Sequence, residues 1–194
     1  MTAQIDLSFP HAWQAEILPQ RPLIQPPRHF TYPREAEEVE RGALEVLVRP
    51  AEDAPFLATF ALGFADAAAP SGLWSCPHPD ELCAVAGGYA YVVDTRNPEQ
   101  FTQIALRPVL EVRPLPAQKL LLFAGSYSLL AWGSGGLAWQ TLRLSAEGLR
   151  ITEIQEETLR GFGWDLMSDR EVPFAVDLAT GHLLAARRGD SGRP

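Results

Sequence analysis

The sequence predicts a mainly-β fold of antiparallel strands, and two patterns carry this prediction. Apolar side chains alternate with other residues along 44–48 and 56–64, which is the period of two expected of strands with one buried face. Two apolar runs also flank Gly87-Gly88, a two-residue connection typical of a tight β-hairpin. No segment keeps the 3.6-residue spacing of a long amphipathic helix, so we expect an antiparallel β protein.

Each predicted strand is bounded by residues that favour turns. Pro50 ends the first strand, and Gly, Pro, Asn, Asp and Ser occupy the gaps between the others. Residues 161–165 (GFGWD) lie between the last two predicted strands, and their glycines predict a turn or loop. The further apolar runs predict strands at 82–86, 89–93, 104–112, 120–124, 127–132, 136–144, 149–154 and 172–178.

An internal repeat organises the predicted hairpins. Residues 86–90 (AGGYA) match residues 124–128 (AGSYS) at a spacing of 38 positions, and 92–95 are echoed by 175–178. A period near 40 suits a four-stranded propeller blade, and 91–95 and 174–181 resemble the inner strands of propeller repeats. At about 40 residues per blade the chain holds at most four blades. We therefore expect antiparallel hairpins in a β-propeller-like or sandwich arrangement.

We expect three parts along the chain. Residues 1–34 hold six prolines among large apolar side chains, which predicts a Pro-rich N-terminal arm packed on the domain. Residues 35–186 are expected to form a single β-rich domain. Residues 187–194 are polar and are expected to form a disordered tail.

Composition narrows the classes of partner. A chain of 194 residues can bury a core of its own, and its net charge of −8 disfavours nucleic acid and anionic membranes as partners. We see neither an export signal nor an apolar run of membrane-spanning length, so we expect a cytoplasmic protein. Lys119 is the only lysine among many arginines, which is typical of a GC-rich bacterial genome. No glycine pattern of a nucleotide-binding loop occurs, so no cofactor is expected, and the oligomeric state is not predicted.

Aromatic side chains in or beside the predicted hairpins are the candidate binding residues. If these rings point outward, they form a recognition surface, and if they point inward, they fill the core. The sequence is compatible with both arrangements. The candidates are Trp74, Tyr89, Trp132, Trp139 and Trp164.

Two carboxylates beside Trp164 are the candidate catalytic residues. Asp165 and Glu171 lie within a few positions of each other, and paired carboxylates can perform acid–base chemistry. This pattern would make the chain a small-molecule enzyme, a hydrolase or a lyase. The alternative is a turn whose tryptophan packs inward while the charged groups stay in water, and we favour that alternative.

Cys76, His78 and Cys83 share one loop and are the candidate metal ligands. Zinc binds such groups, but structural zinc sites normally combine two closely spaced ligand pairs. Here the spacing is wider and no second pair exists, so we expect both cysteines to be thiols, with Cys83 entering the buried strand as a small apolar residue.

The function expected from these observations is a non-catalytic binding or protein-interaction module. Loops on β scaffolds commonly carry binding residues, and an acidic chain favours a basic protein partner. A small ligand is the other partner considered, and the enzyme with carboxylates around Trp164 and Glu171 is the alternative function.

Overall fold

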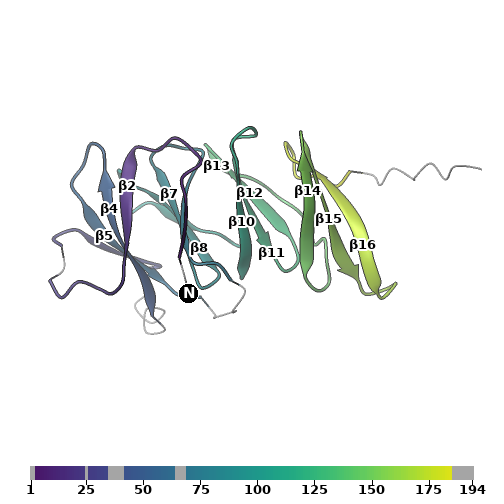
Figure 1. Ribbon diagram of the computed structural model, residues 1–194, viewed down its shortest axis with the longest axis horizontal. Coiled ribbons are helices and arrows are strands. Elements are labelled where there is room, and N and C mark those ends of the chain that lie inside the picture. Colours follow the sequence, from purple (N-terminus) through teal and green to yellow (C-terminus); the bar gives the residue numbers. More distant parts are fainter. Residues whose placement is uncertain (1–2, 25, 35–41, 64–68, 185–194) are drawn as a thin grey trace, which may run out of the picture.

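Figure 1 shows the computed structural model of the chain, which describes residues 3–24, 26–34, 42–63 and 69–184. The regular secondary structure of these residues consists of β-strands alone, which confirms the predicted class. The strands form several mainly antiparallel sheets, none of which closes into a barrel. In the described part of the chain no helix is long and apolar enough to cross a membrane.

The strands pair into four sheets, which we number 1 to 4 in the order in which they stand along the molecule (Figure 1). Sheet 1 contains, in spatial order, β2 (Trp13–Leu18), β4 (Ala43–Pro50), β5 (Phe56–Ala61) and β3 (His29–Tyr32). Sheet 2 contains β1 (Gln4–Asp6), β6 (Gly72–Ser75), β7 (Glu81–Ala86), β8 (Tyr89–Asp94) and β9 (Phe101–Gln103). Sheet 3 contains β10 (Val109–Leu115), β11 (Leu120–Gly125), β12 (Leu129–Gly133) and β13 (Gly136–Gln140). Sheet 4 contains β14 (Leu149–Gln155), β15 (Thr158–Asp165) and β16 (Arg170–Asp177).

The four sheets stand side by side in a row along the longest axis (Figure 1). An apolar cluster fills each of the three gaps between neighbouring sheets. Representative members are Phe60 and Tyr91 between sheets 1 and 2, Val85 and Phe123 between sheets 2 and 3, and Leu122 and Leu159 between sheets 3 and 4. Sheets 2 and 3 are therefore covered on both faces, which explains why β7 and β11 are almost continuously apolar.

The predicted hairpin at Gly87-Gly88 is confirmed. Strands β7 and β8 pair in antiparallel register up to Ala86 and Tyr89, and both glycines have positive φ, as a type I′ turn requires. The repeat also falls on equivalent positions of successive sheets. Residues 86–90 join β7 to β8, and residues 124–128 join β11 to β12, the corresponding hairpin of sheet 3.

The first 34 residues contribute strands to two sheets. Strand β1 pairs in parallel with β6 of sheet 2, whereas β2 and β3 are the two edges of sheet 1. Prolines interrupt this stretch between strands, because proline lacks the N–H that a strand ladder needs. The structure does not show a separate arm, and the predicted tail at 187–194 lies outside the described residues.

One local prediction is wrong. Residues 161–165, expected as a turn or loop, belong to β15, the central strand of sheet 4. The two glycines serve close packing there and form no turn. A Cβ on Gly161 would lie 2.5 Å from the Phe174 ring, and one on Gly163 would lie 2.5 Å from the Leu144 carbonyl oxygen.

The two ends of the row of sheets differ. On the outer face of sheet 1, Arg21 from the connection between β2 and β3 contacts Glu45 and Thr59. No described strand covers the outer face of sheet 4, which stands at the opposite end of the molecule (Figure 1). Trp164 of β15 lies on that bare face.

Candidate functional site

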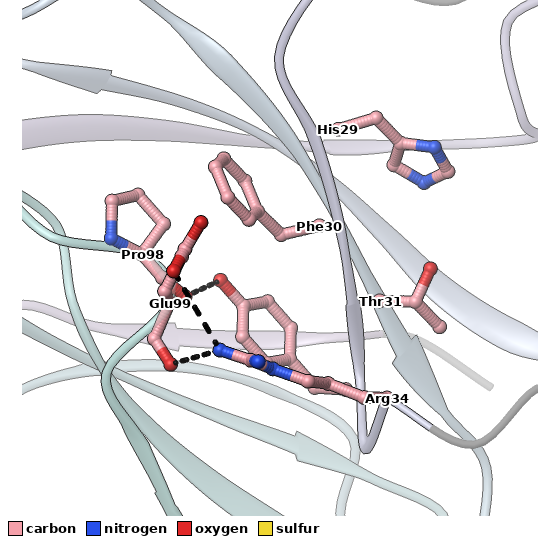
Figure 2. A pocket seen from close by; sticks show the side chains of 7 residues that line it. His29, Phe30, Thr31, Arg34, Pro98 and Glu99 are labelled. Carbon is pink, nitrogen blue, oxygen red and sulfur yellow. Dashed lines mark hydrogen bonds and ion pairs between the residues drawn. The ribbon is translucent and has the colours of Figure 1, made fainter.

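A hollow of about 300 Å³ lies beside β3, the edge strand of sheet 1 (Figure 2). The Tyr32 hydroxyl donates a hydrogen bond to the Pro98 carbonyl at 2.7 Å, and Arg34 donates to the Glu99 carbonyl at 2.9 Å. These bonds join sheet 1 to the loop before β9 of sheet 2. Burial raises the pKa of Tyr32, so its hydroxyl stays protonated as a donor. The polar groups of Tyr32 and Arg34 are therefore occupied in holding two sheets together.

A polar network on the outer face of sheet 1 brings together His29, Thr59 and Glu45. The Thr59 hydroxyl donates to Glu45 Oε2 at 2.6 Å, and His29 Nε2 lies 2.9 Å from the same hydroxyl. Arg21 donates to Glu45 Oε1 at 2.7 Å. Because the only hydroxyl proton is directed at the carboxylate, His29 does not activate Thr59 as a nucleophile.

Burial, followed by the charge of Arg21, lowers the pKa of His29. The imidazole is therefore held neutral and donates its Nε2–H to Thr59. Sequence reasoning missed this network, since its residues are widely spaced and form no motif. Its satisfied hydrogen bonds indicate a structural role.

Four of the five candidate aromatic residues are buried. Trp74 is fully enclosed between sheets 2 and 3, and Tyr89 packs against Gly63 with the Arg107 guanidinium 4.9 Å from its ring centre. Trp132 donates its indole N–H to Glu81 at 2.8 Å, and Trp139 donates to the Leu178 carbonyl at 2.7 Å. These side chains lie in the interior of the fold and do not converge on one surface.

Trp164 differs from the other four candidates because it is partly exposed. Its strand register places it opposite Glu171, and Phe162 lies two residues earlier on the same outer face of sheet 4. On the neighbouring strand β14, Arg150 stands opposite Phe162, and its guanidinium lies 5.1 Å from the centre of the Phe162 ring. Arg150 also forms an ion pair with Glu171 at 3.3 Å. We call Arg150, Phe162, Trp164 and Glu171, with the neighbouring Glu147, the Trp164 face.

Two hollows adjoin Trp164. One, of about 250 Å³, is lined by the side chains of the Trp164 face together with Gly148 and Leu149. The other, of about 440 Å³, lies between the 143–146 segment and the end of β15, where Leu166 is 70% exposed. Met167, in the same β15–β16 turn, is 94% exposed. Exposed aromatic, methionine and arginine side chains are typical of protein-binding surfaces.

The two candidate catalytic carboxylates do not form a pair. Glu171 lies on the outer face with Trp164, whereas Asp165 follows Trp164 and is directed into its own turn. There it accepts hydrogen bonds from the Ser168 hydroxyl at 2.5 Å and from the Met167 N–H at 3.3 Å. These bonds lower the pKa of Asp165, so the group stays ionised at neutral pH.

The three candidate metal ligands lie in different environments, because the two cysteines are buried and His78 is partly exposed. Cys76 and Cys83 lie in the core between sheets 2 and 3, and burial raises the pKa of both thiols. His78 stays on the loop, where its Nδ1 accepts the Asp80 N–H at 3.3 Å. Within the described chain no three His, Cys, Asp or Glu side chains are grouped as metal ligands.

We compared the chain with models of protein families and with curated proteins. Neither comparison finds a match. Functional inference therefore rests on the geometry of the chain itself. Among the candidate residues, that geometry brings together Trp164 and Glu171, and it adds Phe162, Arg150 and Glu147, which the sequence analysis did not single out.

Proposed function

We propose that this chain is a non-catalytic protein-interaction module that binds its partner through the Trp164 face. The observation that carries the proposal is the partial exposure of Trp164 beside Phe162, on a sheet face that no described strand covers. A partly exposed tryptophan surrounded by charged groups matches the composition of binding hot spots.

The neighbouring turn supports the same proposal. Leu166 and Met167 place apolar surface in water next to Trp164, which costs free energy unless another molecule covers it. Arg150 and Glu171 provide a charged rim on the outer face. An apolar centre with a polar rim is the usual anatomy of a transient protein interface.

The proposed arrangement of the fold is propeller-like. We infer that sheets 2, 3 and 4 are successive blade-like units, because β6–β9, β10–β13 and β14–β16 each pair in chain order, with β1 added at the edge of sheet 2. The repeated turn sequences at 86–90 and 124–128 support this relation. In such an open row of units the outer face of sheet 4, which no described strand covers, is suited to docking.

Site-specific photo-cross-linking tests the proposed function. A photoreactive amino acid replaces Phe162 in the native host, and the control carries it at Leu137, a 56% exposed residue of β13 in sheet 3. We expect a discrete adduct with one protein, identified by mass spectrometry, from position 162 and not from position 137. Absence of an adduct at 162, or the same adducts from both positions, contradicts the proposal.

A further inference from the structure

The hollow of about 250 Å³ on the Trp164 face combines aromatic rings with charged side chains. One of the side chains that line it is a cation of the chain itself, Arg150. The guanidinium of Arg150 lies 5.1 Å from the Phe162 ring centre and 3.3 Å from a carboxylate oxygen of Glu171. A ring face and a carboxylate together stabilise a guanidinium through cation–π attraction and a charge-assisted hydrogen bond.

Trp164 and Glu147 offer the same combination of groups in the same hollow. No described arginine or lysine lies over the Trp164 ring, and Glu147 is exposed without an ion-pair partner among the described residues. Tryptophan is the aromatic side chain that attracts cations most strongly. The hollow therefore suits a second cation, which the described chain does not supply.

The surrounding charge favours a cation over an anion. Residues 143–178 contain eight acidic and four basic side chains, so this segment carries a net charge of −4, half of the total. Two of its four arginines are already paired, Arg150 with Glu171 and Arg160 with Glu153. The potential near sheet 4 is therefore negative and attracts basic segments.

We propose that the Trp164 face recognises an arginine in a basic segment of the partner protein, with the guanidinium stacked on Trp164 and bonded to Glu147 and Glu171. This inference rests on the proposed function and specifies the chemistry of the partner. Arginine fits better than lysine, because its planar guanidinium can stack on the indole and donate several hydrogen bonds at once.

An oligo-arginine peptide is the probe, and the intrinsic fluorescence of Trp164 is the readout. The other four tryptophans, Trp13, Trp74, Trp132 and Trp139, are each at most 7% exposed, so a collisional quencher in water reports mainly on Trp164. We expect the peptide to protect Trp164 from quenching and to bind at least about threefold more tightly than oligo-lysine of equal length. Binding should weaken strongly at about 1 M salt, where the Debye length is about 3 Å.

Variants separate stacking from general attraction between opposite charges, with affinities measured by calorimetry. Trp164→Leu and Glu147→Gln should each weaken oligo-arginine binding about fivefold, while Trp164→Phe should retain part of it. Glu157→Gln removes the same charge outside the hollow and should change the affinity by less than about twofold. Arg150→Gln frees Phe162 and Glu171 for the probe, so it should strengthen binding.

Equal effects of Glu147→Gln and Glu157→Gln, equal affinity for oligo-lysine, or unchanged binding by Trp164→Leu would overturn this inference. So would weaker binding by Arg150→Gln, because the proposal treats Arg150 as a competitor. If the probe fails while cross-linking from position 162 still captures one specific protein, only the arginine inference falls and the proposed function stands. If cross-linking also fails, both fall.

Discussion

At the scale of single residues, Thr59 stands at the centre of the polar network on sheet 1. Its buried hydroxyl connects His29 to Glu45, which is also bonded to Arg21. Thr59→Val preserves the shape of the side chain but removes the donor to Glu45 and the acceptor for His29. We expect it to lower the free energy of unfolding by about 1–3 kcal/mol, measured by urea denaturation.

The matched control is Thr102→Val, at an exposed threonine of β9. We expect that change to alter the free energy of unfolding by less than about 0.5 kcal/mol. Equal losses at the two positions would show that the network around Thr59 contributes nothing specific to stability.

The residues of the Trp164 face show what could be predicted at this scale. Trp164 and Glu171 stood out as candidates because of their chemistry. Arg150 and Phe162 did not, because they meet only through the register of β14 and β15. The turn that sets this register contains Glu156, a non-glycine residue with φ of 50°, and therefore carries no Gly or Asn signal.

At the scale of elements, β15 shows why the pair of glycines was misleading. Glycine is uncommon inside strands, so GFGWD predicted a turn. In the structure Gly161 and Gly163 face the neighbouring sheet and admit the Phe174 ring and the Leu144 carbonyl. The need for such close approach comes from tertiary packing, which local sequence patterns do not contain.

Gly163→Ala tests this account of β15. The new Cβ would lie 2.5 Å from the Leu144 carbonyl oxygen and 3.0 Å from the Ser145 Cβ, so the adjoining loop must shift. We expect a loss of about 1–3 kcal/mol in the free energy of unfolding, measured by denaturant titration. The Ser145 hydroxyl accepts a hydrogen bond from the backbone N–H of Trp164 at 2.8 Å, so this shift should also disturb the Trp164 face.

Gly135→Ala is the matched control, because a Cβ at Gly135 meets no atom within 4 Å. We expect that variant to keep the stability of the original chain to within about 0.5 kcal/mol. Unchanged stability of the Gly163→Ala variant would contradict close packing of β15 against the 143–146 segment.

At the scale of the whole molecule, the sequence indicated the class of fold and the spacing of its hairpins. Alternating apolar residues lie in β4 and β5, and the Gly87-Gly88 turn joins β7 to β8. The period near 40 separates corresponding hairpins of sheets 2 and 3. The order of sheets in the row was not predictable. It depends on which apolar faces pack together, and almost continuously apolar strands such as β11 give no indication of which neighbour covers which face.

No described strand covers the outer face of sheet 4, and sheet 1 stands at the opposite end of the row, so a direct test is possible. The measurement is amide hydrogen exchange of the full chain, with and without the partner identified by cross-linking from position 162. We predict slower exchange in β14, β15 and the 143–148 segment, with sheet 1 unchanged. Protection confined to sheet 1 or to the hollow beside β3, with sheet 4 unaffected, would contradict the assignment of the Trp164 face as the binding surface.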